Sequence, residues 1–204
     1  MKYIYIFYFI SVICRAQNTD LKLLQTLNAK EYRNWDAGMN GVSFSVYPVM
    51  PITVGGIWIN GYLKKDKQIK RDAFKSATAI GLAIAISTSL KYIVNRTRPY
   101  TEFPNEIIKR GEDSGPYSFP SGHTTAAFST ATALSLTYKK WEVIIPSIVY
   151  AGFVGYSRMR LGMHYPSDVL GGAIIGVGSG FLIWRLDKLI RKTQSSKKSK
   201  ELSP

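Results

Sequence analysis

The sequence predicts an all-α fold, a multi-span transmembrane helical bundle, and three observations support this prediction. Charged residues of the 204-residue chain are concentrated in short runs. The uncharged stretches between these runs are rich in Ala, Gly, Ser and Thr, which allow helices to pack closely. Lys and Arg are unevenly distributed among the connectors, as is typical of membrane proteins. The five uncharged stretches are residues 37–63, 76–90, 120–138, 143–157 and 169–184.

The first sixteen residues have the pattern of a signal peptide. Lys2 precedes an uncharged run, and the small residues Cys14 and Ala16 stand close before Gln17, as cleavage after Ala16 requires. We therefore expect residues 1–16 to be a signal peptide and residues 17–36 to be an exported N-terminal segment. An uncleaved short anchor is the alternative.

The lengths of the five stretches are compatible with membrane crossing. The first is long enough to span a bilayer, although it contains Pro48 and Pro51. The other four are near or slightly below the usual length of about 17–25 residues. Length alone therefore leaves a soluble exported helical bundle as the alternative.

The basic residues of the connectors predict the topology. They follow the first, third and fifth stretches, at residues 64–71, 139–140 and 188–204. If every stretch crosses once, these three segments lie on one side, which the positive-inside rule makes cytoplasmic. We expect residues 37–187 to form the helical domain and residues 188–204 to form a basic cytoplasmic tail. The connectors after the second and fourth stretches, and an exported N-terminus, then face outward.

The composition argues against two other classes of site. The net charge of +14 raises the question of nucleic acid, but the basic residues lie in connectors and in the tail, without interleaved aromatic residues. We therefore expect no nucleic-acid partner. With one Cys and two His in the chain, a zinc site built on these residues is not expected.

Both histidines are predicted to face outward, because His123 lies at the start of the third stretch and His164 lies in the connector after the fourth. His164 is followed four residues later by Asp168, which can orient the ring and raise its nucleophilicity. A carboxylate that only favours a helix start is the alternative. His123 follows Ser121 and Gly122 at the start of a predicted helix, where free backbone N–H groups form an anion site.

Three cations accompany the histidines. Lys91 and Arg98 are seven residues apart and share a face if the helix persists, whereas Arg96 lies off that face and is expected to be structural. Snorkelling at the membrane interface is the alternative for the first two. Lys91, Arg98 and Arg158 together provide the positive charge and forked donors that phosphoryl transfer requires. One histidine would attack phosphorus and the other would protonate the leaving oxygen.

These residues form a three-part pattern between residues 91 and 168. It reads Lys91-x6-Arg98-Pro99, Pro120-Ser121-Gly122-His123 and Ser157-Arg158-x5-His164-x3-Asp168. This pattern resembles the signature of the type 2 phosphatidic acid phosphatase (PAP2) and vanadium haloperoxidase superfamily, in its membrane-bound bacterial lipid phosphatase form.

The resemblance implies a role for each signature residue. His164 would be the nucleophile that forms a phosphohistidine, Asp168 would orient it, and His123 would be the general acid. The residues implied in phosphate binding are Lys91, Arg98, Ser121, Gly122 and Arg158. The resemblance also implies no metal and no cofactor, and a lipid phosphate or diphosphate substrate reached from the outer leaflet.

The function expected from the sequence is that of a metal-independent phosphatase in the cell (inner) membrane, with a phosphorylated lipid as its substrate and the active site facing the exterior. A soluble exported nonspecific acid phosphatase of the same superfamily is the first alternative. A transport or binding protein that holds the lipid without hydrolysis is the second. The identity of the lipid and the oligomeric state stay open at this point.

Overall fold

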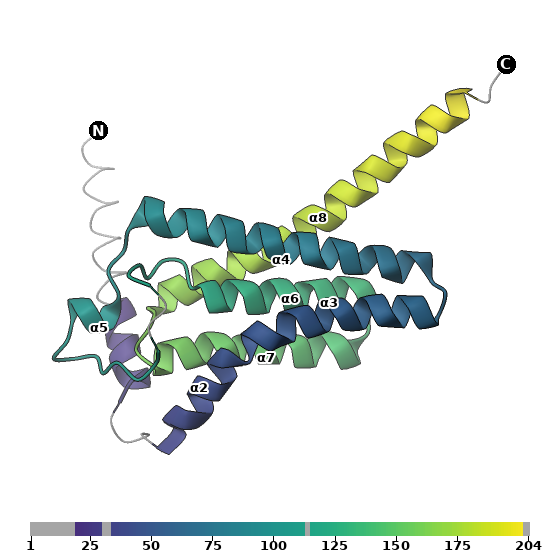
Figure 1. Ribbon diagram of the computed structural model, residues 1–204. Coiled ribbons are helices and arrows are strands. Elements are labelled where there is room, and N and C mark those ends of the chain that lie inside the picture. Colours follow the sequence, from purple (N-terminus) through teal and green to yellow (C-terminus); the bar gives the residue numbers. More distant parts are fainter. Residues whose placement is uncertain (1–18, 30–33, 113–114, 202–204) are drawn as a thin grey trace, which may run out of the picture.

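The computed structural model describes residues 19–29, 34–112 and 115–201, with side chains to residue 195 (Figure 1). A helical segment at residues 19–27 precedes helices that are labelled as in Figure 1. These are α2 (Asp36–Phe44), α3 (Val46–Leu63), α4 (Lys67–Val94), α5 (Pro99–Glu102), α6 (Gly122–Tyr138), α7 (Trp141–Arg160) and α8 (Pro166–Glu201). The described ranges contain no strand, only an isolated bridge between Thr97 and Tyr117. The all-α prediction is confirmed.

The five uncharged stretches correspond to α2 with α3, then α4, α6, α7 and α8. The helix ends are marked by capping polar side chains and by residues whose backbone conformation is left-handed. The Asp66 carboxylate caps α4 by accepting hydrogen bonds from the backbone N–H groups of Gln68 and Ile69. Asn95 ends α4 and Lys139 ends α6 with φ values of 51° and 50°. The runs of charged residues in the sequence therefore lie at the helix ends.

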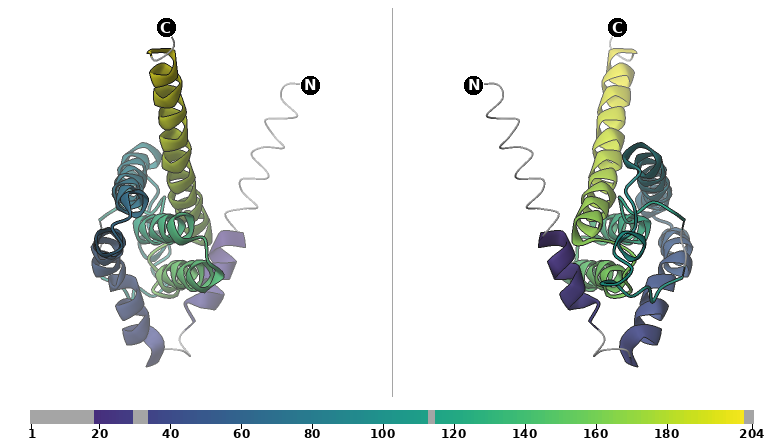
Figure 2. Two further views of the ribbon diagram at one scale, coloured as in Figure 1. Left: turned by 90° about the vertical axis from the view of Figure 1, so that its right-hand side faces the viewer. Right: turned by 90° about the vertical axis from the view of Figure 1, so that its left-hand side faces the viewer.

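Helix α6 is the centre of the bundle. Figure 2, which looks along the bundle, shows α6 among α3, α4, α7 and α8, and α6 contacts all four. Its small side chains allow these close approaches, and Ala126, Ala127, Ala131 and Ala133 are all buried. A Cβ atom on Gly176 of α8 would lie 2.5 Å from the Thr125 carbonyl oxygen of α6, so this crossing depends on glycine.

Three helical stretches are long and apolar enough to cross a membrane: Asp36–Leu63, Lys67–Val94 and Pro166–Ser195. Large apolar side chains such as Ile52, Ile93 and Leu170 are more than 60% exposed on their outer surfaces. Such a surface fits lipid rather than water. The prediction of several membrane-spanning helices is confirmed. That α6 and α7 also cross stays a prediction, based on their place in the same bundle (Figure 1).

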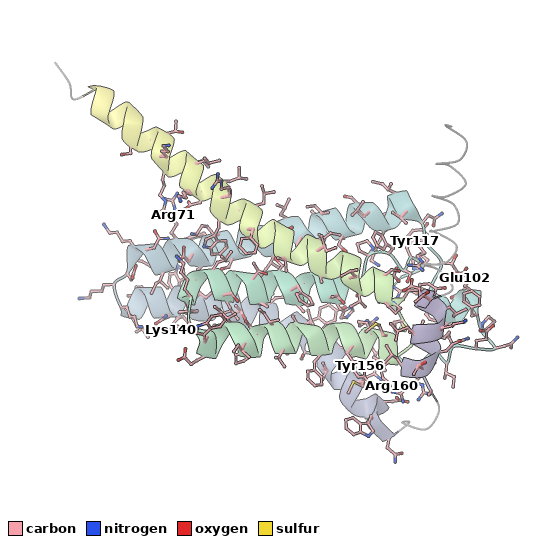
Figure 3. All side chains as sticks on the ribbon, turned by 180° about the vertical axis from the view of Figure 1, so that it is seen from behind. Arg71, Glu102, Tyr117, Lys140, Tyr156 and Arg160 are labelled. Carbon is pink, nitrogen blue, oxygen red and sulfur yellow. The ribbon has the colours of Figure 1, made fainter. Side chains whose placement is uncertain are left out.

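The basic connectors lie together at one end of the bundle. Arg71 and Lys140 lie there, whereas Glu102, Tyr117 and Arg160 lie at the opposite end (Figure 3). Helix α8 extends beyond the basic end and runs to Glu201 without a break at residue 188. The connectors predicted to face outward therefore share one end of the bundle. The predicted signal peptide, residues 1–16, lies outside the described residues.

Candidate active site

The predicted site residues come from six elements that meet at the end of the bundle opposite the basic connectors. Lys91 is in the last turn of α4, Arg98 precedes α5, and His123 is in the first turn of α6. Arg158 is in the last turn of α7, and Asp168 is in the first turn of α8. His164 lies between these two helices. Helix ends thus bring together residues that are far apart in the sequence.

A cavity of about 220 Å³ lies between these elements and α3. Five of the predicted residues line it: Lys91, Arg98, Gly122, His123 and His164. Side chains of α3, α4 and α6 form an apolar part of the same wall, which includes Val46, Met50, Ile84 and Ala126. The cavity therefore joins a cationic end to an apolar end. His123 also lines a neighbouring cavity with Arg158.

The imidazole of His164 is buried between Asp168 and Arg98. Nδ1 lies 3.5 Å from Asp168 Oδ2, and Nε2 lies 3.4 Å from Arg98 Nη1. A proton on Nδ1 faces the carboxylate in this arrangement, which leaves the Nε2 lone pair on the cavity side. Burial lowers the pKa of His164 to about 3, although the hydrogen bond and charge of Asp168 oppose this shift. The ring is therefore neutral at pH 7 and can act as a nucleophile.

The buried imidazole predicts a pH dependence of stability. His164 has an ordinary pKa of 6.5 and a pKa of about 3 in the folded protein. Between these values the unfolded chain binds a proton that the folded protein does not, so the free energy of unfolding falls as the pH falls. We expect this group to contribute up to about 1.4 kcal/mol per pH unit.

Thermal unfolding of the detergent-purified protein at about pH 7 and about pH 4.5 measures this contribution. The decrease in Tm on acidification should be smaller in His164→Asn than in the wild type. An equal decrease in both proteins would contradict the lowered pKa.

Asp168 is held by donors from three parts of the chain. Its Oδ2 accepts a hydrogen bond from the Tyr165 N–H at 2.9 Å and another from the Ser118 hydroxyl. Its Oδ1 accepts one from Arg96 Nη1 at 2.7 Å. The side chain is fully buried. Such a carboxylate is fixed in position and can hold His164 in one orientation.

The cations are positioned by hydrogen bonds to neutral groups. Lys91 Nζ donates to the Tyr117 carbonyl at 2.9 Å. Arg98 donates through Nε to the Gly115 carbonyl at 2.6 Å and through Nη1 to the Met163 carbonyl at 2.9 Å. Arg158 Nη1 donates to the Ser43 hydroxyl at 2.6 Å. The cation positions are thus set by the loops and helices around the cavity.

Ser121 and His123 have different surroundings. The Ser121 side chain is buried and caps α6, with its Oγ 2.8 Å from Thr124 Oγ1, and it is not among the residues that line the 220 Å³ cavity. The ring of His123 packs edge-on against Tyr47 of α3, with ring centroids 5.2 Å apart. The role of Ser121 in phosphate binding stays a prediction.

The sequence did not indicate Ser87, Thr88 or Ser118 as site residues, and Arg96 was expected to be structural. Arg96 and Ser118 contact Asp168, and Ser87 and Thr88 line the cavity. The four-residue spacing from Ser87 to Lys91 places both on one face of α4, so this signal could have identified Ser87. The contacts of Arg96 and Ser118 join loops to α8 and are not visible as a local pattern.

Comparison with known proteins adds three similarities. The sequence model of the PAP2 superfamily matches residues 72–192. Undecaprenyl-diphosphatase BcrC of Bacillus subtilis is 31% identical over 137 residues, which is 66% of this chain and 66% of that protein, slightly less than two thirds of its length. Lipid A 4'-phosphatase of Bacteroides thetaiotaomicron is 29% identical over 192 residues, 86% of this chain and 80% of that protein.

The fold is also similar to a solved structure. The solved structure is the crystal structure of a transmembrane PAP2 type phosphatidylglycerolphosphate phosphatase from Bacillus subtilis, to which this chain is similar with a TM-score of 0.69 and 24% identity. The similarity covers 91% of this chain and 94% of that chain.

Proposed function

Because the chain belongs to the PAP2 superfamily, whose sequence model covers residues 72–192, we propose that it is a phosphatase that hydrolyses a phosphorylated lipid. The observation that carries this proposal is the cavity in which both histidines, Lys91 and Arg98 face an apolar wall. The cationic end suits a phosphate group, and the apolar end suits the first part of a lipid chain. Relatives named for undecaprenyl diphosphate and lipid A add support.

The proposed reaction has two steps. In the first, His164 Nε2 attacks phosphorus, the bond from phosphorus to the lipid oxygen breaks, and protonated His123 gives its proton to that oxygen. In the second, His123 accepts a proton from water as the water oxygen attacks the phosphohistidine. The bond from phosphorus to nitrogen then breaks and inorganic phosphate leaves. Burial and the nearby cations Arg158, Arg98 and Lys91 lower the pKa of His123 to about 3 in the absence of substrate. The negative charge of bound phosphate opposes this shift and favours the protonated form of His123 in the first step.

Asp168 and the cations have separate tasks in this mechanism. Asp168 stabilises the positive charge that develops on His164 when Nε2 forms its bond to phosphorus. Lys91, Arg98 and Arg158 stabilise the non-bridging oxygens, where negative charge is concentrated in the transition state. Phosphate release by the detergent-purified protein from a panel of lipid phosphates and diphosphates tests the proposed function. Absence of release from every member of the panel would contradict it.

We propose that no metal ion takes part, because the cationic side chains can stabilise the phosphate without one. Among the residues that the structure describes, no three His, Cys, Asp or Glu side chains gather in a way that could hold a metal. We expect phosphate release to change less than about twofold in the presence of EDTA. Strong inhibition by EDTA that added Mg²⁺ or Zn²⁺ reverses would contradict the proposal.

The protein is a multi-pass membrane protein, and we propose that its site faces the outside of the cell. The support is the gathering of the basic connectors at the other end of the bundle (Figure 3), which the positive-inside rule makes cytoplasmic. A soluble acid phosphatase is less favoured, because three helices are long and apolar enough to cross a membrane. Substrate then reaches the cavity from the outer leaflet.

Cysteine labelling tests this orientation. Thr101 of α5 lies at the end of the site and Lys140 lies at the opposite end, and both are exposed. In intact cells, we expect a membrane-impermeant maleimide to label Thr101→Cys but not Lys140→Cys. After the membrane is opened, both should react. Labelling of Lys140→Cys alone in intact cells would reverse the proposed orientation.

A further inference from the structure

The helical segment at residues 19–27 contacts the connectors of the candidate site. It lies at the same end of the bundle as α5 (Figure 1). Asp20 in its first described turn is only 8% exposed. The Asp20 carboxylate accepts hydrogen bonds from the Ser167 N–H at 2.8 Å, from the Ser167 hydroxyl and from Arg96 Nη2 at 2.9 Å. The segment thus reaches the residue next to Asp168.

Arg96 joins Asp20 to Asp168. Its Nη2 donates to Asp20, and its Nη1 donates to Asp168 Oδ1 at 2.7 Å. Its guanidinium lies over the ring of Tyr165, 3.8 Å from the centroid. Although burial opposes the charged form, the carboxylates of Asp168 and Asp20 raise the pKa of Arg96 above its ordinary value. The guanidinium is therefore charged and is held in one plane by two carboxylates and one aromatic ring.

The other oxygen of Asp168 faces the candidate nucleophile. Asp168 Oδ2 lies 3.5 Å from His164 Nδ1, so the contacts form a continuous chain from Asp20 through Arg96 and Asp168 to His164. A residue that contacts and orients such a group commonly affects function without touching the reacting atoms.

We propose that Asp20 is a positioning residue for the reaction, which fixes Arg96 and through it the orientation of Asp168 and His164. This inference rests on the proposed phosphatase function. Without the Asp20 carboxylate, the Arg96 guanidinium can rotate about its side-chain bonds. It then moves together with the Asp168 carboxylate and no longer fixes the position of that carboxylate. Arg96 would also pair with Asp168 alone, which leaves less negative charge to stabilise the imidazolium that develops on His164.

A structural role alone would not single out Asp20, because other contacts hold the segment. Gln25 donates a hydrogen bond to Glu106. Asn28 donates to the carbonyls of Ile108 at 3.0 Å and Arg160 at 2.9 Å. Leu24 is fully buried. These contacts connect the segment to the same outer loops but do not involve Arg96 or Asp168.

Steady-state kinetics of Asp20→Asn, with Gln25→Ala as the matched control, test the proposal. The measurement is phosphate release from a lipid phosphate in detergent micelles. We expect kcat of Asp20→Asn to fall about tenfold, with KM changed less than about twofold, because the cations that bind phosphate are not altered. We expect both constants of Gln25→Ala to stay within about twofold of the wild type, and Asp20→Glu to recover part of the lost kcat.

The double variant provides a second test. Because Asp20 acts through Arg96, Arg96→Lys should also lower kcat, and Asp20→Asn with Arg96→Lys should be no slower than Arg96→Lys alone. Three results would each overturn the positioning role while the phosphatase function stands. They are a kcat of the double variant that is reduced by the product of the two single losses, an unchanged kcat in Asp20→Asn, and a loss of kcat in Gln25→Ala equal to that in Asp20→Asn. A wild-type protein inactive on every lipid phosphate would overturn both.

Discussion

Substitution of His164 by alanine is expected to abolish phosphate release, with a loss in kcat of about 10⁴-fold or more, because the proposed nucleophile is removed. The ring is 1% exposed, and its Nε2 lies on the cavity side beside Arg98. None of the cavity cations is removed, so binding of the lipid phosphate should be largely retained. The measurements are phosphate release and equilibrium binding of a labelled lipid phosphate to purified protein in detergent.

Comparison with Arg98→Ala separates catalysis from binding. Arg98 is also buried and lines the same cavity, but its proposed task is to bind the phosphate oxygens. We expect this variant to weaken lipid binding by about tenfold or more, since a charge-assisted, forked donor is lost. If His164→Ala hydrolyses the substrate as fast as the wild type, the phosphatase mechanism is wrong and a lipid-binding or transport protein becomes the better description.

The fold could be predicted from the sequence because its signals are local. Each uncharged stretch coincides with one or two helices, and the charged runs coincide with their ends, as at the Asp66 cap of α4. Two features were not foreseen. Ser45 separates α2 from α3 inside the first stretch, and α8 continues through residue 188. No Gly or Pro marks the break at Ser45, and the absence of Gly and Pro from residues 181–201 allows α8 to continue.

The candidate site could be predicted only in part. The residues proposed to carry the chemistry, such as His123 and His164, stand out because the chain has only two histidines. Their supporting contacts do not, because Arg96 and Asp168 are 72 residues apart and Arg96 and Asp20 are 76 residues apart. Pairings at such separations depend on how the helices are arranged.

The arrangement of α6 links the fold to the chemistry. Its first turn carries His123 and its small residues pack against α8, which carries Asp168 in its own first turn. The backbone N–H of Ser121 donates to the carbonyl of Asp168 at 3.0 Å, so the two helix starts are joined directly. This contact thus joins the helix start that carries the proposed general acid to the helix start that carries the carboxylate beside His164.

The second large effect is expected at His123, and its size should depend on the leaving group. In the proposed mechanism His123 protonates the lipid oxygen as the bond to phosphorus breaks. The ratio kcat/KM reports the first step, in which the leaving group departs, whereas the second step is the same for every substrate. An alkyl oxygen is a poor leaving group without a proton, so His123→Asn should lower kcat/KM for a lipid monophosphate by about 10²- to 10⁴-fold. A phenolic oxygen leaves readily as an anion, so the loss in kcat/KM for p-nitrophenyl phosphate should be about tenfold or less. Phosphate release from both substrates measures the difference.

A diphosphate lipid provides the decisive comparison with this variant. Its leaving group is a phosphate monoester, a much weaker base than an alkoxide, so it needs little help from a general acid. If the protein accepts such a substrate, His123→Asn should lose less activity on it than on a monophosphate with the same lipid chain. Tyr47→Phe, which keeps the aromatic ring against His123, is the control variant. It should change the rates for the monophosphate and the diphosphate lipid by the same factor. Equal losses in kcat/KM for all three substrates in His123→Asn would show that His123 positions the phosphate rather than protonating the leaving oxygen.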